Sequence, residues 1–259
     1  MKIPYYHVDA FTDRIFAGNP AGVCLLEYWP TDAILQSIAA ENSLSETAFV
    51  VAAGEEYQLR WFTPQVEIDL CGHATLAAAF VLYRLDRNTA GPIRFTTKSG
   101  DVSVSRRDDL LILDFPARPA QTCGMPENLV RGLGLTPSSV YKSRDYLAVF
   151  EHEKQITDLD PDFALLAALD CVGIIVTAPG DQVDFVSRFF APGAGIPEDP
   201  VTGSAYCTLI PYWADQLARQ ELQARQLSQR GGTIFCENKG ERVFIGGSAI
   251  LYSQGTLIL

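Results

Sequence analysis

The sequence predicts an α+β protein of two pseudo-symmetric lobes, each a curled, mainly antiparallel sheet around a central apolar helix. Three features carry this prediction: a weak internal repeat, many strand-like segments separated by short turns, and one apolar helix in each half. The chain has 259 residues, of which 47% are hydrophobic, so it is long enough for one large domain or two medium ones.

Four short segments of the first half recur in the second half, in the same order and at a nearly constant spacing. Each match is weak alone, but the shared order favours a duplication. We therefore predict an N-terminal lobe over 1–118 and a C-terminal lobe over 119–259. The matching pairs are Phe62-Thr63-Pro64 with Phe190-Ala191-Pro192, Cys71-Gly72-His73-Ala74 with Thr202-Gly203-Ser204-Ala205, 98–102 with 230–234, and 111–113 with 243–245.

Residues of the first lobe alternate between strand and helix patterns. Thr31 is a good helix N-cap, and the apolar spacing that follows it predicts an amphipathic helix over 32–42. Residues 73–85 are apolar on nearly every side, which predicts a helix that is buried all round. Strands are predicted over 5–10, 47–53, 57–62, 93–97, 101–105 and 110–115.

The second lobe repeats this pattern. A helix is predicted over 204–218, and Pro211 is expected to kink or divide it. Strands are predicted over 146–151, 172–177, 183–190, 232–237, 242–246 and 249–252.

Charge and composition exclude several classes of partner. A formal net charge of -11 disfavours nucleic acid and anionic membrane surfaces. The N-terminus lacks a signal-peptide pattern and the longest apolar run is too short to span a bilayer, so we expect a cytoplasmic protein. Six cysteines without a CxxC pair, and three histidines without ligand spacing, lead us to expect no metal.

The two apolar helices both begin in a turn that contains glycine, at Gly72 and at Gly203. Helix N-termini carry unpaired N–H groups and a partial positive charge, and glycine lets a ligand approach the backbone. If a pseudo-twofold axis relates the lobes, both N-termini face one cleft between them. We expect a small carboxylate to bind there.

Polar side chains gather at the same two turns. His73 follows Gly72, while Asp199, Thr202 and Ser204 surround Gly203. The simpler interpretation is helix capping for the second group and a satisfied core histidine for the first. Glu46 is another candidate, although a glutamate between a helix and a strand is most often a solvated loop residue.

Six stretches of the chain resemble the phenazine-biosynthesis PhzF-like family of isomerases, which share the diaminopimelate epimerase fold. The stretches run from the first strand into the last third of the chain, and their combination is specific. They are His7-Val8-Asp9-Ala10-Phe11-Thr12, Phe16-Ala17-Gly18-Asn19-Pro20-Ala21-Gly22-Val23, Asn42-Ser43-Leu44-Ser45-Glu46-Thr47-Ala48-Phe49, Leu59-Arg60-Trp61-Phe62-Thr63-Pro64, Asp69-Leu70-Cys71-Gly72-His73-Ala74-Thr75 and Glu198-Asp199-Pro200-Val201-Thr202-Gly203-Ser204-Ala205.

The resemblance implies proton transfer on a small carboxylated substrate, without a cofactor, in a homodimer. It places the catalytic glutamate on Glu46 and its supporting catalytic residues on His73, Asp199 and Ser204. It also implies that the amides of Gly72 and Gly203 hold the substrate, and we add Asn19 and Thr202 as candidate substrate-binding residues. Tyr206 and Phe190 are further candidates for lining the pocket.

Related epimerases and racemases use two cysteines, one before each helix, as paired acid and base. The equivalent positions here are Cys71 and Thr202. A threonine hydroxyl is far too weak an acid to replace a thiol, so the resemblance favours a one-base isomerisation by Glu46. The role of Cys71 stays open between a small packed residue and a minor participant.

Three alternatives remain at this stage. The first is a catalytically silent protein that binds a small carboxylate in the same cleft. The second is a protein whose activity is association with other proteins, which predicts an exposed apolar patch. The third is a one-base amino-acid epimerase.

Overall fold

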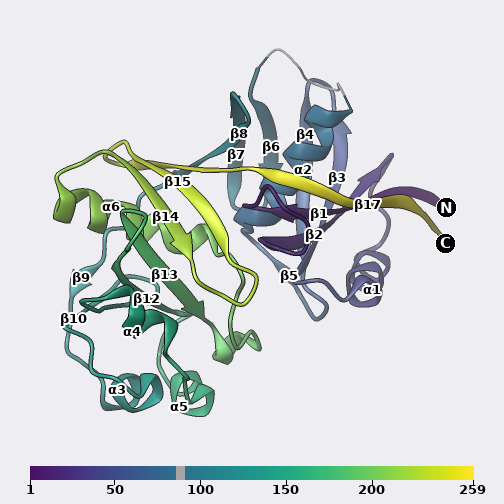
Figure 1. The fold of residues 1–259 in the computed structure, drawn as a ribbon. Helices are drawn as coiled ribbons and strands as arrows, with labels where there is room; N and C mark the ends of the chain where they lie inside the picture. The colour runs from purple at the N-terminus through teal and green to yellow at the C-terminus, as the bar shows by residue number, and fades with distance from the viewer. Residues whose placement is uncertain (86–90) are drawn as a thin grey trace. The chain divides into compact units, whose positions relative to one another are not determined.

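Strands dominate the chain, and the fold is a mixed α+β structure, as the sequence predicts (Figure 1). The computed structural model describes residues 1–85 and 91–259. Contacts between residues divide the chain into a first unit, Met1–Asp114 with Gly246–Leu259, and a second unit, Phe115–Ile245. Within the described part of the chain, no helix is long and apolar enough to cross a membrane.

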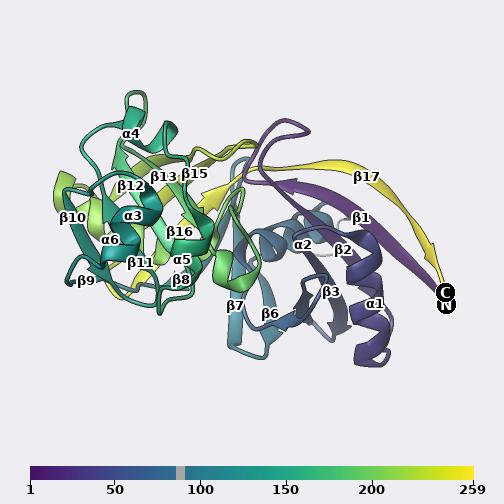
Figure 2. The ribbon, with the colours of Figure 1, turned by 90° about the horizontal axis from the view of Figure 1, so that it is seen from below.

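This grouping differs from the predicted division at the C-terminal end of the chain. The last strand, β17 (Ala249–Ile258), pairs antiparallel with the first strand, β1 (Lys2–Ala10), over the whole length of β1. The two chain ends therefore lie side by side, as both ribbon views show (Figures 1 and 2). A pairing between residues so far apart in sequence leaves no local sequence signal. The predicted division therefore placed this strand in the C-terminal lobe.

The first unit follows a regular order of strand pairing around one helix. Its helices are α1 (Asp32–Asn42) and α2 (Gly72–Arg84), and a short strand β5 (Glu67–Ile68) pairs with β4. From β1 to β7 the pairs alternate between antiparallel and parallel, and each parallel pair is connected through a helix. In order they are β1 with β2 (Asn19–Leu26) antiparallel, β2 with β3 (Glu46–Ala53) parallel, β3 with β4 (Glu56–Phe62) antiparallel, β4 with β6 (Ile93–Thr97) parallel, and β6 with β7 (Gly100–Arg107) and β7 with β8 (Leu110–Pro116) antiparallel.

The second unit repeats the same alternation. Its elements include β9 (Gln121–Thr122), α3 (Glu127–Leu133), α4 (Glu153–Thr157), α5 (Phe163–Ala167), the 3-10 helix η1 (Pro192–Ala194), α6 (Gly203–Leu217) and the greater part of β16 (Arg242–Gly247). The pairs are β10 (Ser139–Lys142) with β11 (Tyr146–Val149) antiparallel, β11 with β12 (Ile174–Pro179) parallel, β12 with β13 (Phe185–Phe190) antiparallel, β13 with β14 (Glu221–Gln226) parallel, and β14 with β15 (Gly232–Asn238) antiparallel. The predicted repeat is thus confirmed in the topology.

The two central helices are buried as predicted. Ten of the thirteen residues of α2 are buried, including Leu76, Val81 and Leu82. Nine of the fifteen residues of α6 are buried. Because these helices fill the interiors of their units, their first residues can be held in fixed places by the surrounding strands.

Pro211 does not divide α6, contrary to one of the two predicted outcomes, since the helix runs unbroken from Gly203 to Leu217. A proline inside a helix leaves the carbonyl four residues earlier without its usual partner. Here that carbonyl belongs to Cys207, and it accepts a hydrogen bond from the backbone N–H of Arg118 (2.8 Å). A neighbouring segment therefore supplies the donor that Pro211 lacks.

Candidate functional site

Four polar side chains of the first unit meet at the start of α2, and we call them the first-turn cluster: Asn19, Glu46, Cys71 and His73. Glu46 Oε2 lies 2.9 Å from His73 Nε2. On the other side of the imidazole, Asn19 Nδ2 lies 3.2 Å and Cys71 Sγ lies 3.5 Å from Nδ1. All four residues are buried, Glu46 with only 6% of its surface exposed.

The local fold explains why these residues meet. Strands β2 and β3 are parallel neighbours, so Asn19 and Glu46, the first residues of the two strands, lie at the same edge of the sheet. Gly18 has a φ of +65°, and a Cβ there would lie 2.1 Å from the carbonyl oxygen of Ala10. Only glycine fits this turn, which delivers Asn19 to the ring of His73.

Cys71 occupies the N-cap position of α2 but makes no side-chain capping bond. Instead its carbonyl oxygen accepts hydrogen bonds from the backbone N–H (3.1 Å) and the hydroxyl (2.6 Å) of Thr75. The thiol therefore does not serve to cap the helix, and it faces the imidazole of His73.

The electrostatics of the cluster favour a charged pair. Burial acts to lower the pKa of His73, but Cys71 and Glu46 outweigh it and raise that pKa well above its usual range. Burial, with the charge of Glu46 adding to it, raises the pKa of the Cys71 thiol to about 11. Glu46 Oε2 is the partner that lies against Nε2 of the imidazole.

Glu46, Cys71 and His73 also offer three metal-ligand atoms within 4.8 Å of one another, which the sequence spacing did not predict. The two ring nitrogens, however, face different partners. Nε2 faces Glu46, whereas Sγ of Cys71 lies nearer to Nδ1 (3.5 Å) than to Nε2 (3.9 Å). A single ion on Nε2 would not reach the thiol at a bonding distance of about 2.3 Å unless the side chains rotated.

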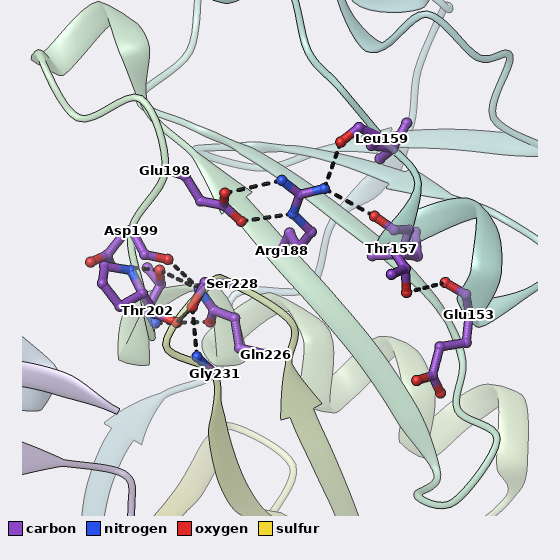
Figure 3. A network of polar contacts seen from close by, with 12 residues as sticks. Glu153, Thr157, Leu159, Arg188, Glu198, Asp199, Thr202, Gln226, Ser228 and Gly231 are labelled. Atoms are coloured by element: carbon purple, nitrogen blue, oxygen red, sulfur yellow. Dashed lines mark hydrogen bonds and ion pairs between the residues drawn. The ribbon is translucent and has the colours of Figure 1, made fainter. Parts of the chain in front are cut away.

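A second polar group lies at the start of α6 in the second unit, and we call it the second-turn cluster: Arg144, Asp199, Thr202, Ser204 and Gln226. The Thr202 hydroxyl donates to Asp199 Oδ2 (2.6 Å), and Gln226 contacts both residues (Figure 3). Thr202 is the N-cap residue without a side-chain capping bond, so capping does not explain its hydroxyl. Ser204 Oγ accepts a hydrogen bond from Arg144 Nη2 (3.1 Å).

Sequence reasoning missed Arg144 and Gln226. Asn19 is the first residue of β2 and contacts His73, the residue after Gly72. Arg144 lies just before β11 and contacts Ser204, the residue after Gly203, so the two residues occupy similar places in the two units. Extending the internal repeat to these strands could have found Arg144. Gln226 ends a strand of polar residues, where a buried glutamine cannot be told from exposed ones.

The structure brings together Asn19, Glu46, Gly72 and His73 within the first unit, and Asp199, Thr202, Gly203 and Ser204 within the second. Glu46 has no ionisable counterpart, because Gly173 and Ile174 occupy the start of the equivalent strand β12. The two units therefore carry different ionisable side chains at equivalent positions, although their strand topology repeats. Tyr206 and Phe190 are fully buried large side chains, and their role in lining a pocket stays a prediction.

The family model described as PhzC-PhzF, phenazine biosynthesis-like protein, matches residues 8–255. A Pseudomonas aeruginosa protein named as an uncharacterized isomerase is 51% identical over 259 residues, and the match covers all of both chains. The crystal structure of a PhzF-family phenazine biosynthesis protein from Enterococcus faecalis is 48% identical, covers both chains completely and superimposes with a TM-score of 0.98. A predicted epimerase from Pseudomonas aeruginosa, 18% identical over 99% of each chain, has the same fold with a TM-score of 0.78.

Proposed function

The chain belongs to the PhzC-PhzF family of phenazine biosynthesis-like proteins, and on this premise we propose that it is an isomerase that shifts a proton on a small carboxylated substrate. Glu46 is the proposed general acid and base, and the reaction uses no cofactor. The observation that carries the proposal is the buried Glu46 carboxylate, 2.9 Å from an imidazole at the glycine-led start of α2.

The proposed reaction breaks one C–H bond and forms another. Glu46 takes a proton from a carbon next to an activated centre, and the electron pair spreads toward the substrate carboxylate. The same carboxyl group then returns the proton to a different carbon. Negative charge that develops on the substrate is stabilised by the N-terminus of α2 at Gly72 and by the imidazolium of His73.

Burial supports this role for Glu46. Few water molecules compete with a bound substrate for the Glu46 carboxylate, which is 6% exposed, while this remaining exposure lets its proton exchange with solvent during turnover. His73 holds the carboxylate from one side and is itself held by Asn19. Because a protonated imidazole donates from both nitrogens, the Asn19 amide can rotate to present its oxygen to Nδ1.

The predicted roles of Asp199 and Ser204, of Gly203 and Thr202, of a homodimer and of a cytoplasmic location stay predictions. Participation of the second-turn cluster in the same reaction is testable by a double-mutant cycle. Asp199→Asn and Glu46→Gln should be non-additive in their effects on rate if both residues act on one substrate.

The proposal is tested by incubating the protein in deuterated water with a panel of small unsaturated carboxylates, hydroxycarboxylates and amino acids, followed by NMR. Migration of a double bond with deuterium at a new carbon is the expected result. Deuterium at the α-carbon of an amino acid together with loss of chirality would instead identify a one-base epimerase. Binding without any deuterium uptake would identify a catalytically silent binding protein.

A further inference from the structure

We propose that Gln226 is a positioning residue that fixes the direction of a hydrogen-bond chain from Gln226 through Thr202 to Asp199. The inference rests on the proposed function in one respect only, which is that Asp199 serves the reaction. It assigns to Thr202 the role of a relay that orients the Asp199 carboxylate, rather than that of an acid or base.

Gln226 is the last residue of β14, and only 1% of its surface is exposed. Its Oε1 accepts a hydrogen bond from the backbone N–H of Thr202 (2.9 Å). Its Nε2 donates to the carbonyl oxygen of Asp199 (2.8 Å) and to Thr202 Oγ1 (3.1 Å). A buried glutamine with three such bonds is a fixed element of the turn.

The orientation of the Gln226 amide follows from chemistry. Amide oxygen and nitrogen can be exchanged by rotation, so a network must decide between them. A rotated amide would set its NH₂ against the N–H of Thr202 and its oxygen against the carbonyl of Asp199. Both contacts would be repulsive, and the NH₂ group must therefore point to Asp199 and Thr202.

This orientation determines where the Thr202 hydroxyl sends its proton. A hydroxyl has one donor and two acceptor sites. Because Thr202 Oγ1 accepts from the Gln226 amide, its single proton is free to be donated to Asp199 Oδ2, 2.6 Å away. The chain thus ends with a short donor contact on one defined oxygen of the Asp199 carboxylate (Figure 3).

The backbone of this turn has separate supports. Glu198 makes a two-pronged ion pair with Arg188 of β13 (2.7 and 3.0 Å), and Arg188 also donates to the carbonyl oxygens of Ile156 and Leu159. The N–H of Asp199 donates to Phe189 O (3.0 Å), and Ser228 Oγ donates to Pro200 O (2.8 Å). We therefore expect the turn to keep its path when Gln226 or Thr202 changes, with the Asp199 side chain losing its fixed orientation.

The hydrogen-bond chain also explains what threonine provides at a position where related epimerases carry a thiol. A cysteine S–H is a weak donor and a weak acceptor. A thiol at 202 would contact the amide and the carboxylate poorly, whereas a serine hydroxyl would replace the threonine hydroxyl directly. Serine and cysteine at 202 are therefore expected to give opposite results.

The experiment compares Gln226→Glu with Gln223→Glu, the same chemical change at an exposed position of β14. Thr202→Val, Thr202→Ser, Thr202→Cys and Asp199→Asn are measured alongside, using the substrate that shows Glu46-dependent deuterium uptake. Circular dichroism and thermal melting check that each variant folds. The readouts are kcat and KM, measured separately.

We expect Gln226→Glu, Thr202→Val and Thr202→Cys to lower kcat by about tenfold or more, the size of one lost buried hydrogen bond, with KM changed by less than about threefold. Gln223→Glu should stay close to the unsubstituted protein, and Thr202→Ser, which keeps the hydroxyl, should recover most of the kcat lost in Thr202→Val. Normal kcat in Gln226→Glu and Thr202→Val, with a loss in Asp199→Asn, would overturn the inference and leave the proposed function intact. Full activity of Asp199→Asn would overturn it as well, whereas failure of the proposed function would show as full activity of Glu46→Gln. A gain of activity in Thr202→Cys would point to acid–base chemistry at 202 and would also contradict the relay.

Discussion

Glu46 and His73 form a buried pair, with Oε2 of the carboxylate 2.9 Å from Nε2 of the imidazole. The two residues come from different elements, the first residue of β3 and the second residue of α2. Removing one member of a buried ion pair is strongly destabilising, because it leaves the other charge buried without a partner.

His73 should stay protonated at neutral pH, because its pKa is raised well above the usual value of 6.5 despite burial. A raised pKa in the folded state means that the pair stabilises the protein fully below the unfolded value, and that this contribution is lost as pH rises through the folded value. The imidazole signals of His7, His73 and His152 can be followed by NMR titration. Glu46→Gln should lower the midpoint of His73 and leave that of His152 unchanged, and an unshifted His73 midpoint would contradict the charged pair.

Cys71 should react slowly with iodoacetamide at pH 7.5, because burial raises the pKa of its thiol to about 11 and limits access to it. Cys123 is exposed and free, and it serves as the internal reference in the same molecule. Mass spectrometry after timed alkylation should find Cys123 modified first. Modification of Cys71 at a comparable rate would indicate an ionised thiol and would revive a catalytic role for it.

Gly18→Ala should destabilise the protein strongly, because residue 18 has a positive φ and a new Cβ would collide with Ala10 O. Gly54 has a similar φ of +69°, and a Cβ added there would meet nothing within 4 Å, so Gly54→Ala is a matched control. We expect Gly54→Ala to cost about 1 kcal/mol for the left-handed backbone alone. Gly18→Ala should cost about 3 kcal/mol.

Urea unfolding measures both changes. Equal losses in the two variants would show that the collision at residue 18 is relieved without cost. Because Gly18 precedes Asn19, the same variant should also displace the Asn19 amide from His73, which a shift in the His73 titration would report.

Much of the fold could be predicted from local patterns. The helix over 32–42 was predicted with its observed bounds, because its apolar spacing begins directly after Thr31. Thr31 occupies the N-cap position as predicted but makes no side-chain capping bond there. The buried central helices were predicted because nearly every residue over 73–85 is apolar.

Other elements could not be predicted, for identifiable reasons. Strand β2 begins with Asn19-Pro20-Ala21-Gly22, residues typical of a turn, and it becomes a strand only through its neighbours β1 and β3. Strand β14 contains mostly polar residues, and its buried face shows only in the folded protein. The pairing of β17 with β1 depends on residues from opposite ends of the chain.

The candidate site shows the same limit. The glycine-led turns with His73 and Ser204 were visible in the sequence, and the family resemblance supplied Glu46. The contact between Ser204 and Arg144 and the chain through Gln226 depend on strands that pack together only in three dimensions. Polar residues from distant strands leave no spacing signal that would connect them to the turn.

The proposed function depends on the Glu46 carboxylate as the carrier of the proton. Its most direct test is the rate of deuterium incorporation from solvent into a turned-over substrate, compared between Glu46→Gln and Glu41→Gln. Glu41 is exposed on α1, so the control makes the same chemical change away from the buried pair. We predict that Glu46→Gln abolishes both label incorporation and isomerisation while Glu41→Gln retains them, and full retention in Glu46→Gln would contradict the role of Glu46 as acid and base.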